Sequence, residues 1–164
     1  MKIIHIFGCP NAGKTVLRNA LVERHPEMWS CGIDEFRRDY SDGTPEGEYE
    51  AQIRFVEAMK NGGFFECSGA GRFVGSYLRD NRQHEQYIIV LDIPSDVCLS
   101  RLDERKYDDI PFPFKVEEGD FTAEIERYLS SDEFERVCAG IPTLRLKETS
   151  LDEQVRKVES FTGI

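Results

Sequence analysis

The amino-acid sequence predicts an α/β fold in which helices cover both faces of a mostly parallel sheet. Along its 164 residues, short apolar runs of strand length alternate about five times with helical segments. The run at 87–93 is apolar at nearly every position, as in a strand that is buried on both faces. Ligands of such sheets bind at the carboxyl ends of the strands, so we expect a functional site along that edge.

Five short segments are expected to form the strands. Most are rich in apolar residues and are followed by a glycine, a proline or a polar turn. In chain order they are 1–7, 29–33, 64–67, 87–93 and 143–146.

Helical spacing of apolar residues predicts the segments between these strands. The first helix has apolar residues at 16, 17, 20 and 21 and ends before Pro26. Ser150 and Glu153 form a capping box at the start of the last helix, whose apolar face begins at Leu151. The proline-containing segment 106–119 fits neither pattern, so we expect a mobile excursion there. The other expected helices are at about 49–59, 72–79, 95–105 and 121–137, with a break near 130–131.

Length and composition predict one soluble, cytoplasmic domain over residues 1–164. Hydrophobic residues make up 40% of the chain and charged residues 32%, and no apolar run is long enough to cross a membrane. The five cysteines include no C-x-x-C pair, which argues against a zinc or redox motif. The net charge of -10 argues against binding nucleic acid by charge alone, although a local arginine cluster could still bind phosphate.

The stretch 8–15 matches G-x-x-x-x-G-K-[ST] and lies between the first strand and the first helix. Two glycines, Gly8 and Gly13, would let the backbone curve around a phosphate with its N–H groups turned inward. Lys14 would reach the β- and γ-phosphates, and the Thr15 hydroxyl would ligate Mg²⁺. The motif predicts a P-loop nucleotide-binding domain but does not separate a kinase from a GTPase or an ATPase. The expected nucleotide-binding residues of the loop are Gly8, Asn11, Ala12, Gly13, Lys14 and Thr15.

Asp34 follows the second expected strand, so it should lie on the same edge of the sheet as the phosphate loop. A carboxylate there can accept the proton of a hydroxyl that attacks the γ-phosphate, and Arg37 or Arg38 can hold a phosphate on the acceptor. We expect Asp34 to be the base and Arg37 the better phosphate-binding residue. A helix N-terminus with its arginines in solvent is an equally good interpretation of this segment.

Glu66 ends the third expected strand, where P-loop enzymes place the carboxylate that holds Mg²⁺ or its waters. Because glutamate is longer than the usual aspartate, we expect it to act through a water molecule. Ser68 and Arg72 follow in a glycine-rich turn and could contact the acceptor. An ordinary turn between a strand and a helix would explain the same residues.

Arg101 and Arg105 lie four residues apart on one face of an expected helix. They lead into the proline-containing segment, so they could close over the transferring phosphate as part of a lid at about 101–119. A solvated helix face is the alternative.

Together these motifs resemble the polynucleotide kinase branch of the small P-loop kinases, a group that is also similar to gluconate, nucleoside and nucleotide kinases. The resemblance runs through the phosphate loop, D-x-x-R at 34–37, the segment 66–72 and R-x-x-x-R at 101–105. It implies a P-loop NTPase three-layer sandwich whose five-stranded sheet has the order 2-3-1-4-5. It also implies that Asp34 activates the acceptor hydroxyl, that Arg37 positions the acceptor's phosphate, and that the arginine pair serves the lid and the donor nucleotide.

We therefore expect an ATP- and Mg²⁺-dependent kinase whose acceptor is a hydroxyl on nucleic acid or a nucleotide. On nucleic acid the hydroxyl would belong to a 5′ end or to a hydroxymethylated base, since the viral DNA hydroxymethyl-base kinases are in the same broad group. A kinase for a small metabolite, such as a nucleoside or a sugar acid, is the alternative that the net charge of -10 favours. A nucleotide-binding module without catalysis is the third possibility. The sequence leaves the acceptor and the oligomeric state open.

Overall fold

The computed structural model describes residues 1–101, 110–113 and 118–164. Its strands are β1 (Lys2–Gly8), β2 (Ser30–Gly32), β3 (Gly63–Cys67), β4 (Glu85–Leu91) and β5 (Thr143–Leu146). The α-helices in these ranges are α1 (Lys14–Arg24), α2 (Ile33–Tyr40), α3 (Pro45–Ala58), α4 (Arg72–Asp80), α5 (Ser95–Ser100), α6 (Glu118–Leu129), α7 (Asp132–Val137) and α8 (Leu151–Thr162). A short 3-10 helix, η1 (Met59–Asn61), follows α3.

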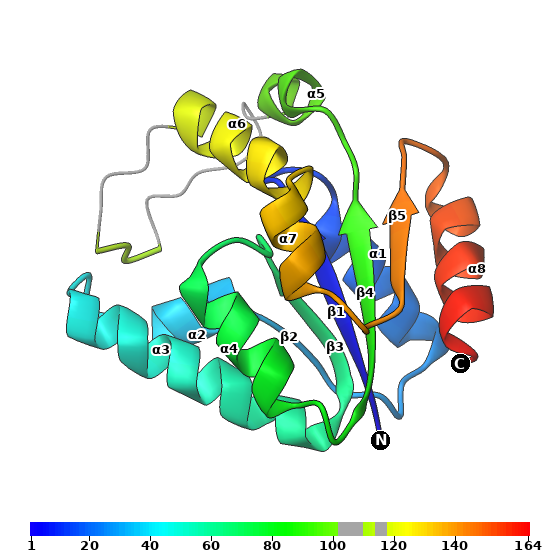
Figure 1. Ribbon diagram of the computed structural model, residues 1–164, viewed down its shortest axis with the longest axis horizontal. Helices are drawn as coiled ribbons and strands as arrows, with labels where there is room; N and C mark the ends of the chain where they lie inside the picture. Colours follow the sequence, from blue (N-terminus) through cyan, green and yellow to red (C-terminus); the bar gives the residue numbers. More distant parts are fainter. Residues whose placement is uncertain (102–109, 114–117) are drawn as a thin grey trace.

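The five strands form one sheet in the order β2-β3-β1-β4-β5, and each pairing is parallel. This confirms the predicted α/β class and the strand order implied by the resemblance. Helices α1 and α8 pack together on one side of the sheet, whereas α4 and α7 lie on the other (Figure 1). The carboxyl ends of the strands form the upper edge of the sheet in Figure 1, on the side where α5 and α6 lie.

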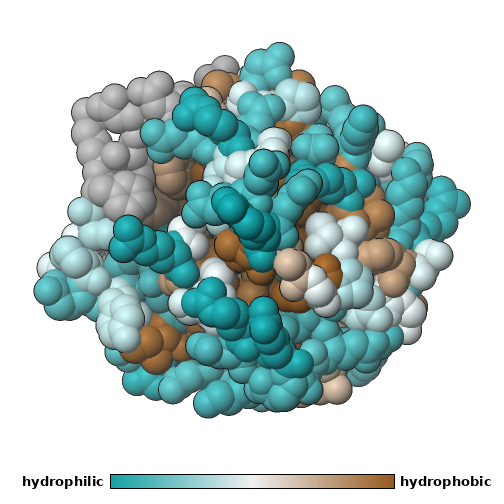
Figure 2. All heavy atoms as spheres, viewed as in Figure 1, coloured by the Kyte–Doolittle hydropathy of each residue, from teal (hydrophilic) through white to brown (hydrophobic). Residues whose placement is uncertain are grey.

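The core lies where the central strands meet these helices. Ile3, Ile4, Ile6 and Phe7 of β1 have no exposed surface, which explains why the opening run is apolar on both of its faces. The face of the molecule seen in Figure 2 is covered mainly by hydrophilic side chains, with hydrophobic residues visible in small areas. No helix in the described ranges is both long and apolar enough to span a bilayer.

Some expected boundaries of the strands differ from the structure. β4 starts two residues earlier than expected because Gln86, a polar residue, is buried and bonds to the His5 ring at 2.9 Å. It ends at Leu91 rather than at 93. β2 ends at Gly32, one residue before the expected end, and the helix that carries Asp34 begins at the next residue, Ile33.

The helical pattern also placed some residues on the wrong face. Val16 and Leu151 were expected on apolar faces but are 57% and 39% exposed, whereas Arg18 is buried. The helix expected to reach 105 is described as α5, which ends at Ser100. Residues 102–109 and 114–117, most of the segment expected to be a mobile lid, lie outside the described residues.

His5 gives the fold a pH dependence that can be measured. Burial lowers the pKa of His5 from 6.5 to about 4, and the hydrogen bond to Gln86 offsets only part of this. The unfolded chain therefore binds a proton at this side chain below pH 6.5, whereas the folded chain does so only near pH 4. The free energy of unfolding should fall by about 1.4 kcal/mol per pH unit within that window because of this residue. Guanidinium titrations of wild type and His5→Gln between pH 7 and 5 test this, and equal slopes against pH would contradict it.

Candidate active site

The phosphate loop lies between β1 and α1, at the carboxyl edge of the sheet. Gly13 has a φ of 100° with open space where a Cβ would lie, so the backbone angle, rather than crowding, favours glycine there. Asn11 also has a positive φ, 62°. Lys14 is the first residue of α1, and its Nζ donates to the carbonyl oxygens of Gly8 at 2.9 Å and Cys9 at 2.8 Å. The ammonium group is therefore held against the loop that carries it.

Thr15 and Glu66 meet across the start of α1 and the end of β3. The Thr15 hydroxyl donates to Glu66 Oε1 at 2.8 Å. The Glu66 side chain is only 12% exposed, and within the described part of the chain its Oε2 is buried without a hydrogen-bond partner. Gly32 makes this burial possible, because a Cβ there would lie 2.8 Å from Glu66 Oε1. The sequence analysis expected both side chains at the carboxyl edge as Mg²⁺ ligands, and their direct hydrogen bond adds to that expectation.

Hydroxyl and carboxylate oxygens are the ligands that Mg²⁺ prefers, and Mg²⁺ keeps several waters and phosphate oxygens in place of a full protein cage. Among the described residues, no cluster of three or more His, Cys, Asp or Glu side chains could hold a metal ion. The Thr15 and Glu66 oxygens, one of them buried without a partner in these ranges, fit an ion that is bound mainly by nucleotide and water.

Arg18 is a residue of the site that the sequence analysis missed. It lies one turn after Lys14 on α1, with its side chain 10% exposed. Its Nη1 is 2.6 Å from Glu35 Oε1 and 3.7 Å from Glu66 Oε1. The positive charge of Arg18 thus stabilises the buried carboxylate of Glu66. The sequence gives little indication that this arginine is buried, because an arginine on the exposed face of a helix would be written in the same way.

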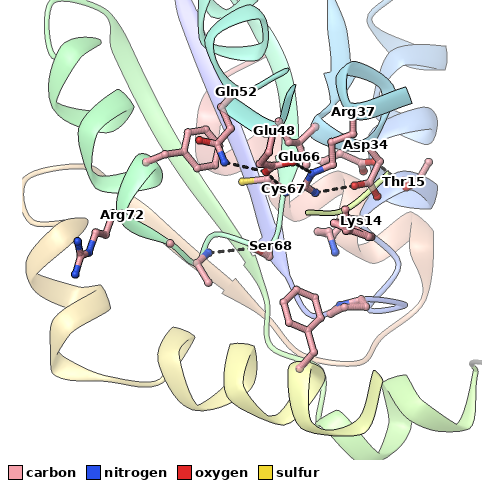
Figure 3. Close-up of a pocket in the computed structure, with 17 residues that line it drawn as sticks. Lys14, Thr15, Asp34, Arg37, Glu48, Gln52, Glu66, Cys67, Ser68 and Arg72 are labelled. Atoms are coloured by element: carbon pink, nitrogen blue, oxygen red, sulfur yellow. Dashed lines mark hydrogen bonds and ion pairs between the residues drawn. The ribbon is translucent and has the colours of Figure 1, made fainter. Parts of the chain in front are cut away.

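A cavity of about 490 Å³ opens beside the phosphate loop. Lys14 and Thr15 of α1 and Asp34 and Arg37 of α2 line it, and the four side chains lie near one another in Figure 3. Ser68 also lines it, and its hydroxyl accepts a hydrogen bond from the backbone N–H of Ala70 at 3.2 Å. The structure therefore brings four predicted site residues of the loop and α2 to one space.

Arg37 has carboxylate partners in this cavity. Its Nη1 donates to Asp34 Oδ1 at 2.9 Å, and its Nε and Nη2 donate to the two oxygens of Glu48 at 2.9 and 2.7 Å. Burial disfavours the charged guanidinium, but the hydrogen bonds and charges of Glu48 and Asp34 outweigh it and raise the pKa of Arg37. Sequence analysis missed Glu48, because it lies on a different helix and nothing local marks it.

The remaining predicted residues are divided between two cavities. Arg72 begins α4 and is exposed at the edge of the same cavity, and its guanidinium points away from the Asp34–Arg37–Glu48 cluster in Figure 3. Arg38 is not among the residues that line the cavity of Arg37. It lines a second cavity together with Arg101, and four residues border both cavities, namely Lys14, Thr15, Asp34 and Glu66.

Arg101 reaches the phosphate loop from the end of α5. Its Nη1 donates to the carbonyl oxygen of Asn11 at 3.3 Å, and its Nη2 donates to Glu148 at 2.8 Å. Arg105, its predicted partner, lies outside the described residues. Arg101 thus contacts the phosphate loop directly.

Cys9, within the loop, has no property of a nucleophile. A hydrogen bond with Cys98 and burial both raise the pKa of its thiol, so the thiolate is disfavoured. All five cysteines are buried, as expected for small core residues.

Neither models of protein families nor curated proteins give a match to this sequence. Solved structures do. A sugar kinase from Janibacter sp. HTCC2649 has a TM-score of 0.70 and 14% identity over 100% of this chain and 95% of its own. For a gluconokinase from Sinorhizobium meliloti 1021 the TM-score is 0.68 and the identity 15%, over 99% of this chain and 91% of its own. Deoxyadenosine kinase from M. mycoides, with bound dCTP, has a TM-score of 0.58 and 16% identity, over 98% of this chain and 97% of its own. The chain therefore has the fold of the small P-loop kinases.

Proposed function

We propose that this protein is a small-molecule kinase, which transfers the γ-phosphate of ATP to a hydroxyl group of an acceptor of metabolite size. The observation that carries the proposal is that Lys14 and Thr15 of the phosphate loop and Asp34 of α2 border the same space beside that loop. A donor phosphate and an acceptor hydroxyl can meet there. The fold that the chain shares with a sugar kinase, a gluconokinase and a deoxyadenosine kinase supports a small acceptor rather than nucleic acid.

Each residue has a role that follows from its position. The acceptor oxygen bonds to the γ-phosphorus while the bond from that phosphorus to the bridging oxygen breaks and ADP leaves. Asp34 takes the proton of the hydroxyl, and Lys14 offsets the charge that moves onto the phosphate oxygens. Thr15 and Glu66 would hold Mg²⁺ or its waters, and the ion, when bound, would neutralise phosphate charge.

A panel of acceptors tests the proposal. The protein is incubated with radiolabelled ATP and Mg²⁺ and offered nucleosides, polyols, sugar acids, 5′-hydroxyl DNA and hydroxymethylated DNA. We expect label in small acceptors. Labelling confined to DNA would restore the polynucleotide kinase hypothesis, and tight nucleotide binding without transfer to any acceptor would leave a non-catalytic module.

Glu66→Gln should raise the Mg²⁺ concentration that gives half-maximal activity by about 10–100-fold, the usual effect of removing a group that orients metal ligands or waters. Glutamine keeps the shape and can still accept from Thr15, so the change isolates the carboxylate charge. The measurement is a Mg²⁺ titration of turnover, with Glu57→Gln on the exposed side of α3 as the control. An unchanged Mg²⁺ requirement would remove Glu66 from the metal site.

A further inference from the structure

The contacts of Arg37 indicate which kind of acceptor this cavity takes. Its guanidinium is bonded by Glu48 through two nitrogens and by Asp34 through the third. One face of the group lies 4.8 Å from the centre of the Phe112 ring. A guanidinium that binds a phosphate or carboxylate normally offers it two parallel N–H groups, and here Glu48 occupies such a pair.

The charge of this cluster is negative. Asp34 and Glu48 carry one negative charge each and Arg37 one positive charge, so the three side chains sum to one negative charge. They are also poorly solvated: the side chain of Glu48 is 11% exposed, that of Arg37 16% and that of Asp34 26%. Glu48 and Asp34 accept from three of the five N–H groups of Arg37, so a second anion would have to bind the remaining two beside two poorly solvated carboxylates that repel it.

Glu48 is held in place from its own helix. Gln52, one turn later on α3, donates through Nε2 to Glu48 Oε1 at 2.8 Å. The start of α3 is fixed by Thr44, whose hydroxyl accepts from the backbone N–H of Gly47 at 3.1 Å. Glu48 therefore belongs to a capped helix, and an entering acceptor would have to break two sets of hydrogen bonds to displace it.

The rest of the cavity wall is suited to an uncharged compound with a flat apolar part. Aromatic side chains from three segments line it, namely Phe73, Phe112 and Phe121. Arg72, the other described arginine of the wall, points away from the cluster (Figure 3). Aromatic rings can pack against a flat ring of a bound compound.

We propose that Glu48 makes this site selective for uncharged hydroxyl compounds, with a nucleoside as the best-fitting class, and against acceptors that carry a phosphate or a carboxylate group. The inference rests on the proposed kinase function and narrows its substrate class. The selectivity comes from an interaction that disfavours anionic acceptors: Glu48 accepts the hydrogen bonds of Arg37 and repels a competing anion.

Pairs of acceptors in which one member carries an added anionic group test the inference. A deoxynucleoside is compared with its 3′-monophosphate, and a hexitol with the corresponding sugar acid, by kcat/KM with ATP and by calorimetric binding in the presence of ADP. We expect the uncharged member of the preferred pair to be favoured at least about tenfold, as for a like charge brought to a weakly solvated site. In Glu48→Gln this preference should fall by about the same factor, because glutamine keeps the shape but releases Arg37.

Glu46→Gln is the control, because it removes the same charge from an exposed position on the same helix. It should leave the preference unchanged. The inference is overturned if wild type favours the charged members, if Glu48→Gln behaves like Glu46→Gln, or if no uncharged member binds. If Glu48→Gln does not fold, the preference of the wild-type protein between charged and uncharged acceptors still tests the inference. Binding with the expected preference but without phosphate transfer would contradict the kinase function and leave the selection by charge standing.

Discussion

Lys14→Ala is expected to lower the rate of phosphate transfer by at least about 10²–10³-fold, the usual cost of removing one preorganised donor to developing charge. The Lys14 ammonium lies at the start of α1, held by the carbonyl oxygens of Gly8 and Cys9. It can move from these neutral acceptors to the more strongly negative phosphate oxygens without a change in the backbone. Alanine favours the helix, so the fold should be retained.

The measurement for Lys14→Ala is steady-state turnover with the best acceptor of the panel, together with a thermal melt. Lys60→Ala, an exposed lysine in η1, is the matched control and should keep wild-type turnover. If Lys14→Ala melts like wild type and turns over equally fast, the assignment of the phosphate loop is refuted. Loss of the fold would show up in the melt and would be separated from loss of chemistry.

The parts of the site that a single continuous motif encodes could be predicted from the sequence. The phosphate loop joins a strand to a helix within adjacent residues, so its location follows from the pattern alone. The same is true of the last helix, where the Ser150 hydroxyl accepts from the backbone N–H of Glu153 at 3.3 Å as the capping box requires. The parallel sheet followed from the alternation of strands and helices, and the strand order from the resemblance.

The contacts between side chains from different helices and strands could not be predicted. Glu48 acts on Arg37 from α3, and Arg18 supports Glu66 from α1, and neither pairing leaves a local pattern. The sequence placed Arg37 next to Asp34 correctly, because both lie on one turn of α2. It could not reveal that a second carboxylate neutralises the arginine, and this contact changes the expected acceptor.

Asp34→Asn is expected to lower kcat by about 10²–10⁴-fold, the usual contribution of a general base, with ATP binding nearly unchanged. Asp34 borders the cavity beside Lys14 and Thr15, whereas the donor nucleotide would be held by the loop itself. Calorimetry with an ATP analogue and single-turnover kinetics separate these two properties. Asp39→Asn, exposed near the end of the same helix, is the control and should keep both.

Asparagine also separates two roles that Asp34 could have. Its amide oxygen can still accept the hydrogen bond from Arg37, which spans 2.9 Å in the structure, but it cannot take a proton from an alcohol. If Asp34 served only to hold Arg37, Asp34→Asn would keep most of its activity. A full loss in kcat with nucleotide binding intact therefore assigns proton transfer to Asp34, whereas near-normal kcat would rule this out and leave Asp34 as a structural partner of Arg37.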